Sequence, residues 1–370
     1  MTSPPRAPVV AALALVAVAC GARTSLEGEA HVGGSGGAGP ISGASVTNAS
    51  VASTATGDDP CMSRTLDHDG SGALVVRTEG EFAFFTTEDG RVMRGDLETG
   101  EELALATGKE GLGDLALFEG YAYFSDLHSV TRVPLAGGPE ENLVSLPATS
   151  YAIAVDASGI YWIDGPSSLS NHEIKRRAPD GSELTLASMV QLPLGLSVGA
   201  HGVLFTDPYD FLADPGTVRL VAPEGGPSTL VVESVPYPQN PFQRDDYLYW
   251  VEASDEMITN HGGIVRIASD GSQHQKVLPL EQQYPVWAMT DGERYYVTVL
   301  DEVGGTHVIA ANYPIAGAQT DVASAESKDV FFTMVATTPK RVVWTVQRGL
   351  ENDGPIDGVK SVCRTAISFL

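Results

Sequence analysis

The segment DHDGSG is the part of the sequence closest to a metal-binding loop. Asp67, Asp69 and Ser71 stand at alternate positions before a glycine, as the oxygen ligands of a calcium loop do. Such a loop needs a bidentate Glu at its twelfth position, which is Thr78 here, and Glu79 comes one residue late. We therefore interpret these residues as a polar turn, keep calcium as the alternative, and predict no cofactor and no metal site.

Motifs for nucleophilic, metal-dependent or phosphate chemistry are absent from the sequence, which has no Gly-x-Ser-x-Gly, His-Glu-x-x-His or phosphate-loop pattern. Asp126, Asp164 and Asp207 recur at the end of a repeated phrase. Residues that recur in register usually serve packing and hydrogen bonding. We expect them to accept hydrogen bonds from backbone N–H groups or from an arginine of the next strand, and we predict no catalytic residue.

A short aromatic phrase recurs seven times along the chain. One copy is GIYWID (159–164), and the others are FAFFTT (82–87), YAYFSD (121–126), GVLFTD (202–207), YLYWVE (247–252), RYYVTV (294–299) and RVVWTV (341–346). The fourth residues of these phrases lie 38 to 47 residues apart and are Phe85, Phe124, Trp162, Phe205, Trp250, Val297 and Trp344. A period in this range is typical of β-propellers.

The residues around each phrase predict four short strands per repeat. In the second repeat, LALF precedes the turn Glu119-Gly120, the phrase follows, a third run ends near Arg132, and ENLVSL comes after a further glycine turn. An acidic residue followed by Gly suits a two-residue hairpin. Because a four-stranded sheet needs neighbours to cover both faces, we predict an all-β fold. It is a single β-propeller of seven four-stranded blades, with six or eight blades as alternatives.

The copies YWID, LFTD and YFSD resemble the YWTD repeat of low-density-lipoprotein-receptor class B propellers. They resemble as closely the propeller-like lipoproteins of bacteria. The resemblance covers about residues 62–370, and the phrases with YYVT and VVWT lack the Asp. Animal YWTD propellers have six blades, whereas this sequence has seven phrases. The resemblance implies a propeller fold and does not identify a ligand.

The N-terminal segment is expected to lie outside the propeller. After Arg6 comes an apolar run of 13 residues, which is too short to span a bilayer and is typical of a signal peptide. Cys20 follows small residues at its end, which resembles a bacterial lipobox, although Ala17 stands where Leu is usual. We predict a lipoprotein signal peptide at 1–19, a lipid-anchored, flexible Gly/Ser/Ala-rich linker at 20–60, and the propeller domain at 61–370.

These features predict an exported protein of the cell envelope that is anchored to a membrane through lipid on Cys20. Gly21 after the Cys favours the outer membrane, by analogy with known lipoproteins. The net charge of −25 argues against a nucleic-acid partner, because binding phosphates requires a basic face.

Cys61 and Cys363 lie at the two ends of the predicted domain, and in an exported protein such a pair suggests a disulfide. We expect CMSRTL (61–66) to supply the outer strand of the last blade, with the disulfide joining this seam. In the alternative, TAISFL (365–370) is the outer strand. Closing so long a loop contributes about 4 to 5 kcal/mol in the chain-entropy model.

Loops of irregular length are expected on one face of the propeller, together with the connections between blades. Irregular loops and aromatic side chains on a rigid face suit binding, although neutral drift of the loops accounts for the same pattern. The carboxylates there are interpreted as a solvated negative rim, with a cation site as the alternative. The candidate binding residues on this face are Tyr151, His172, Tyr209, Asp210, Tyr237, Phe242, His261, Tyr284 and Asp353.

We therefore predict a binding or scaffolding module for a protein, peptide or cell-envelope glycan rather than an enzyme. The alternative is a hydrolase or lyase with a metal in the central channel. Asp114 and Asp156 are among the few carboxylates on the runs that would line this channel. Three or more convergent carboxylate, Asn or His groups there would favour the enzyme, whereas aromatic side chains and backbone groups would favour recognition.

Overall fold

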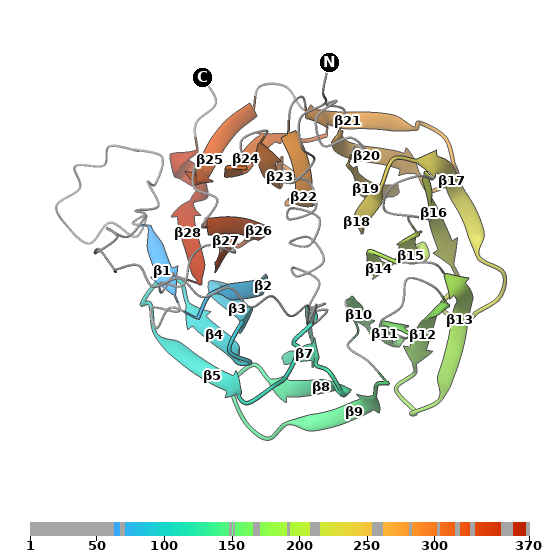
Figure 1. Ribbon diagram of the computed structural model, residues 1–370, viewed down its shortest axis with the longest axis horizontal. Helices are drawn as coiled ribbons and strands as arrows, with labels where there is room; N and C mark the ends of the chain where they lie inside the picture. The colour runs from blue at the N-terminus through green and yellow to red at the C-terminus, as the bar shows by residue number, and fades with distance from the viewer. Residues whose placement is uncertain are drawn as a thin grey trace, which may run out of the picture.

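The computed structural model describes residues 63–66, 71–147, 150, 152–165, 171–190, 193–207, 215–253, 262–280, 283–301, 304–314, 319–325, 330–348 and 358–367, without the side chains of 189, 348 and 366. Its strands form seven four-stranded antiparallel sheets arranged as a ring (Figure 1). The chain is a seven-bladed β-propeller. This confirms the all-β prediction and its blade number, and the alternatives of six or eight blades are wrong.

Each blade follows the order of the chain from its inner strand to its outer strand, apart from the last. The strands, blade by blade and from the inside outward, are β2 (Ala73–Glu79), β3 (Phe82–Thr87), β4 (Val92–Asp96) and β5 (Glu102–Ala106) in blade 1; β6 (Leu115–Phe118), β7 (Tyr121–Ser125), β8 (Ser129–Pro134) and β9 (Glu141–Ser145) in blade 2; β10 (Ile153–Asp156), β11 (Gly159–Asp164), β12 (His172–Arg177) and β13 (Glu183–Val190) in blade 3; β14 (Gly195–Gly199), β15 (Gly202–Asp207), β16 (Gly216–Val221) and β17 (Thr229–Val235) in blade 4; β18 (Pro238–Arg244), β19 (Tyr247–Glu252), β20 (Gly262–Ala268) and β21 (Gln275–Leu280) in blade 5; β22 (Gln283–Thr290), β23 (Arg294–Asp301), β24 (Thr306–Asn312) and β25 (Gln319–Ala325) in blade 6; and β26 (Val330–Thr337), β27 (Arg341–Arg348), β28 (Val359–Cys363) and β1 (Arg64–Leu66) in blade 7.

The ring is closed by the N-terminal strand β1, which pairs with β28 so that Arg64 stands opposite Ser361 (Figure 1). This confirms the predicted origin of the last outer strand. The alternative closing strand is wrong, because residues 364–366 form a short 3-10 helix after β28. Leu66 of β1 is fully buried, and a Cβ on Gly95 of blade 1 would overlap its side chain. Because Gly95 has no side chain, the side chain of Leu66 fits against blade 1 at this position.

The recurring aromatic residues fill the gaps between blades, as predicted. Trp162, Trp250 and Trp344 are 1%, 0% and 3% exposed. Each lies in a core cluster with residues of the preceding blade; Trp162, for example, clusters with Tyr123 of blade 2. The residue one position earlier faces the following blade, as when Tyr161 clusters with residues of β15. Successive side chains of these second strands alternate between two covered faces, so the phrases are apolar at nearly every position.

Blade 5 contains an inner strand that the hydrophobic pattern did not predict. β18 reads PQNPFQR, with two prolines and no alternation. A register irregularity lies between Gln239 and Phe242, and Asn240 has a φ of 44°. Proline is tolerated at the edge of a sheet and at bulges, and β18 is an edge strand.

Candidate functional site

The inner strands of all seven blades enclose a cavity of about 500 Å³ on the axis of the propeller. Each of these strands is the edge of its sheet. Backbone N–H and C=O groups on that edge therefore lack a strand partner on the side of the cavity. The volume lies in the range of small-molecule and side-chain binding sites.

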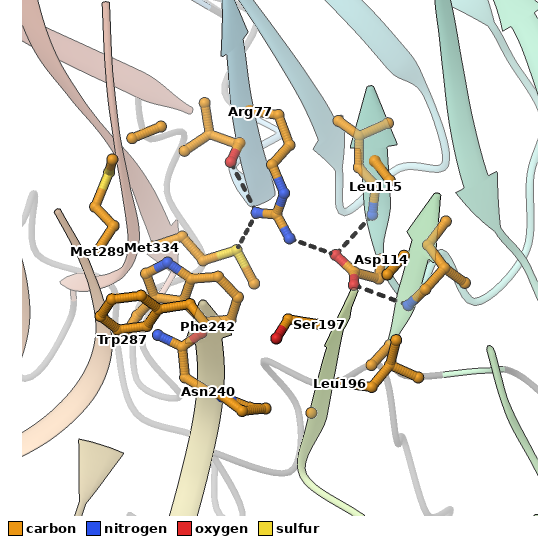
Figure 2. A pocket seen from close by; sticks show the side chains of 18 of the residues that line it. Arg77, Asp114, Leu115, Leu196, Ser197, Asn240, Phe242, Trp287, Met289 and Met334 are labelled. Atoms are coloured by element: carbon orange, nitrogen blue, oxygen red, sulfur yellow. Dashed lines mark hydrogen bonds and ion pairs between the residues drawn. The ribbon is translucent and has the colours of Figure 1, made fainter. Parts of the chain in front are cut away.

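The walls of the cavity are mostly apolar, and one side is richer in polarisable groups. Phe242, Trp287, Met289 and Met334 come from β18, β22 and β26. Figure 2 shows them together on one side, across from Leu115 and Leu196. The ring of Phe242 stacks on Tyr249 with centroids 4.7 Å apart and planes 3° apart, which fixes its orientation. Aromatic and thioether groups give this side a surface suited to a flat or chain-like apolar group.

An ion pair between blades 1 and 2 supplies the charge in the cavity. The Arg77 Nη2 donates to Asp114 Oδ1 at 2.8 Å. Arg77 Nη1 contacts the carbonyl oxygen of Val76 at 3.0 Å and the sulfur of Met334 at 3.5 Å, and the guanidinium carbon lies 5.2 Å from the centroid of Trp287 (Figure 2). Arg77 thus reaches from blade 1 to blades 2, 6 and 7.

Asp114 is the acidic partner of this ion pair, and both of its carboxylate oxygens accept hydrogen bonds. Its Oδ1 also accepts from the N–H of Leu115 at 2.7 Å, and its Oδ2 accepts from the N–H of Ile153 at 3.1 Å. Burial raises the pKa of Asp114, while Arg77 and the two backbone N–H groups oppose that shift. The carboxyl group therefore joins the inner ends of blades 1, 2 and 3 at a cost in desolvation.

Two buried amides of β18 bind the neighbouring inner strand and were missed by the sequence analysis. Gln239 Nε2 donates to the carbonyl oxygen of Pro285 at 2.8 Å, and Asn240 Nδ2 donates to that of Ala288 at 2.7 Å. The signal that could have found them is the repeat itself, which requires an inner strand before YLYWVE whatever its composition.

Four of the nine predicted binding-face residues lie in the described part of the chain. His172 begins β12 and is 3% exposed, and Tyr237 precedes β18 and is 7% exposed. Tyr284 is half-buried at the second position of β22. Phe242 lies within β18 and lines the cavity, rather than a connection between blades.

The other five candidates, Tyr151, Tyr209, Asp210, His261 and Asp353, lie outside the described residues. The binding face therefore stays a prediction. Cys20 and Cys61 also lie outside this part of the chain, so lipid attachment and the disulfide stay predictions as well.

The calcium candidate is described at one position. Ser71 Oγ accepts a hydrogen bond from Arg91 Nη2 at 2.8 Å, whereas Asp67 and Asp69 lie outside the described residues. Across the ranges given above, no group of three or more His, Cys, Asp or Glu residues could hold a metal ion.

The recurring aspartates serve the framework in the copies whose contacts are seen. Asp126 Oδ1 accepts from the backbone N–H groups of His128 and Ser129, both at 2.8 Å, as expected. Asp164 pairs with Lys175 of the next strand, where an arginine was expected. Asp156 caps a hairpin turn, because its Oδ1 accepts from the N–H of Ser158.

Two of the recurring third-strand arginines, Arg94 and Arg176, bind the next blade. Arg94 Nη1 donates to the carbonyl oxygen of Leu135 at 3.0 Å, and Arg176 Nη1 donates to that of Pro223 at 3.1 Å. Both acceptors stand two residues before the first glycine of the next blade's outer turn. These two arginines therefore help to hold neighbouring blades together.

A further recurring position, one after the predicted aromatic, carries buried hydroxyl groups that the sequence analysis did not identify. Ser125 Oγ donates to the carbonyl oxygen of Ser150 at 2.7 Å, and Thr298 Oγ1 donates to that of Thr333 at 3.1 Å. Both acceptors belong to the next blade or to its entering segment. The signal was present as Ser or Thr after the aromatic in five of the seven phrases.

Among the residues that the structure describes, no helix is long and apolar enough to cross a membrane.

Comparisons with known proteins place the chain by fold alone. No protein-family model matches the sequence, and no curated protein matches it. An oligogalacturonate lyase in complex with manganese has a TM-score of 0.59 at 14% identity, over 82% of this chain and 89% of that one. A chain of a mitotic checkpoint complex has a TM-score of 0.57 at 8% identity, over 85% and 95%. A nidogen/laminin complex contains a chain with a TM-score of 0.48 at 18% identity, over 65% and 91%. The two comparisons with TM-scores of 0.59 and 0.57 support the propeller fold, and at these identities they carry no information on ligand or reaction.

Proposed function

We propose that the protein is an exported, lipid-anchored recognition module whose partner inserts an apolar group into the central cavity. The observation that supports this proposal is the wall formed by Phe242, Trp287, Met289 and Met334. Such a wall gains free energy by covering apolar surface, of the order of 25 cal/mol per Å². The inner strands around it are sheet edges, and those of their backbone groups that no side chain already binds suit the amide groups of a peptide.

A protein or peptide partner fits this cavity better than a glycan. A glycan needs many polar partners for its hydroxyl groups, and most of the wall is apolar. The loops of the predicted binding face would then surround the mouth of the cavity and contact the rest of the partner.

A hydrolase or lyase with a metal in the channel remains the alternative function, and the lining supports it less. Asp114 is the only carboxylate among the described residues that line the cavity, and its oxygens already accept three hydrogen bonds. The amide nitrogen of Asn240 is bound to a carbonyl. By the criterion set from the sequence, aromatic and backbone groups favour recognition.

The proposed function is tested by capturing envelope proteins and peptides on the full chain carrying Cys20→Ser, with and without calcium. Affinity for each captured partner is then measured for Trp287→Ala and for Leu230→Ala, a control on the outer strand β17 where Leu230 is 43% exposed. We expect the cavity variant to bind at least tenfold more weakly and the control to bind as the parent does. Equal affinity of both variants would contradict insertion into the cavity.

Membrane attachment through Cys20 is part of the same proposal. We expect metabolic labelling with a radioactive fatty acid to mark the parent chain and not Cys20→Ser, and the variant to leave the membrane fraction. An unlabelled parent chain would contradict lipid attachment without affecting the cavity.

A further inference from the structure

Among the described residues that line it, the cavity offers a charged hydrogen-bond donor to a ligand and no free charged acceptor. Asp114 is 6% exposed, and both of its oxygens are occupied. A cationic ligand group would therefore have to displace Arg77 or a backbone N–H to reach the carboxylate.

The guanidinium of Arg77 can donate further hydrogen bonds to a ligand. Its side chain is 25% exposed, and a guanidinium carries five N–H donors. Among the described residues, one charged bond, to Asp114, and one carbonyl contact use these donors. The third contact is to the sulfur of Met334 at 3.5 Å, and a thioether is a weak acceptor that an oxygen would replace.

The guanidinium is also held beside the apolar wall. Trp287 lies 5.2 Å from the guanidinium carbon, and the ion pair with Asp114 fixes the other side. Figure 2 shows Arg77 between Asp114 and the side that carries Trp287, Phe242 and Met334. A ligand that lies along this wall brings its end group to Arg77.

We propose that the central cavity binds an apolar carboxylate, with its hydrocarbon body against Phe242, Trp287 and Met289 and its carboxylate on the guanidinium of Arg77. Arginine binds carboxylates in a bidentate manner, so the end group gains both charge and geometry. This inference rests on the proposed role of the cavity as a binding site. The carboxylate can belong to a small organic acid or to the C-terminus of a peptide that ends in an apolar residue.

Three probes of similar size test which charge on the end group of the ligand the cavity prefers. They are 2-naphthoate, 2-naphthamide and 2-naphthylmethylamine, titrated by calorimetry into the full chain carrying Cys20→Ser. We expect the naphthoate to bind at least tenfold more tightly than the other two. If the amide or the amine binds as tightly as the acid, the carboxylate assignment is overturned and an apolar cavity site still stands.

Two variants test whether Arg77 causes the preference for the acid. Arg77→Met keeps most of the side-chain length and should abolish the preference for the acid, whereas Arg132→Met, whose arginine pairs with Glu141 outside the cavity, should keep it. A preference that survives in a folded Arg77→Met protein overturns the assignment. If Arg77→Met fails to fold, naphthoate is titrated into Trp287→Phe instead. Loss of binding supports a site in this cavity, and unchanged binding contradicts it.

A second arm separates the two sources of the carboxylate. The peptide Gly-Gly-Phe is compared with its C-terminal amide. Tight binding of the free acid alone assigns a peptide C-terminus, and binding of naphthoate without the peptide assigns a small acid. If neither the naphthalene probes nor the peptides bind at millimolar concentration, the carboxylate proposal is overturned, while the capture experiment above still tests the recognition function by itself.

Discussion

At the scale of single residues, the buried hydroxyl groups of the second strands allow a matched test of what a hydrogen bond contributes. Thr298 and Thr206 occupy the same position of the repeat and are both fully buried. Thr298 donates to the next blade, whereas the hydroxyl of Thr206 has no hydrogen-bond partner among the residues that the structure describes. We expect Thr298→Val to lower the free energy of unfolding by about 1–3 kcal/mol and Thr206→Val to leave it unchanged or raise it. Urea unfolding of both variants measures this, and equal effects would contradict it.

The ionisation of Asp114 gives a second prediction at this scale. Burial raises its pKa above the ordinary 3.8, so the folded chain holds this proton more tightly than the unfolded chain. Stability from this group is therefore fully present below the ordinary pKa and is lost as pH rises through the folded pKa. The free energy of unfolding of the parent minus that of Asp114→Asn should decrease as pH rises above about 4 and then level off.

Asp180 provides the control of opposite sign. The hydroxyl and N–H groups of Ser182 lower its pKa, so its contribution is present at higher pH and is lost on acidification. The difference between the parent and Asp180→Asn should rise with pH. A difference for Asp114→Asn that also rises with pH would contradict the assigned direction.

At the scale of elements, the closing strand β1 is held by a leucine that enters the neighbouring blade. Leu66 is fully buried beside Gly95. We expect Leu66→Ala to cost about 2–5 kcal/mol in urea unfolding, and Thr65→Ala, on the same strand and half-buried, about 1 kcal/mol or less.

A double-mutant cycle checks the same contact. Gly95→Ala overfills the parent core and should cost about 1–3 kcal/mol, but less when Leu66→Ala has emptied the space. Additive costs would show that the two residues do not share this space.

The elements that the sequence predicted are those whose side chains are covered on both faces. The phrase that contains Trp162 was predictable because packing on both faces restricts residue type. The hairpin at Glu119 and Gly120 was predictable because both turn residues have positive φ. β18 was not predictable, because it lacks the apolar alternation of a strand and the amides of Gln239 and Asn240 bind it to β22. Phe242 was therefore predicted on a connection although it lines the cavity.

At the scale of the whole molecule, the residues that line the cavity could not be predicted from the sequence. Arg77, Asp114, Phe242, Trp287 and Met334 come from five different blades and share no motif. Ring closure brings them together, so their proximity depends on every intervening repeat. To predict that these residues line one cavity, both the number of blades and the inner strand of each blade must be known. The number of blades was predicted from the sequence, but the inner strand of blade 5 was not.

Because the cavity exists only in a closed ring, the seam between β1 and β28 controls the whole molecule. β1 contributes three paired residues, the last of which faces Val359, so few hydrogen bonds hold the seam. Cys61 precedes Arg64 by three residues, at most about 10 Å of chain, and Arg64 pairs with Ser361, two residues before Cys363. A bond between the two cysteines is within reach and would keep β1 from leaving.

In the chain carrying Cys20→Ser no other thiol is present, so a reductant acts on this pair alone. We expect reduction, or the double change Cys61→Ala and Cys363→Ala, to lower the free energy of unfolding by about 4 to 5 kcal/mol. Probe binding in the cavity should weaken under the same conditions, because an open seam enlarges the ring. Two titratable thiols in the untreated chain, with a denaturation midpoint that reductant does not change, would contradict the bond.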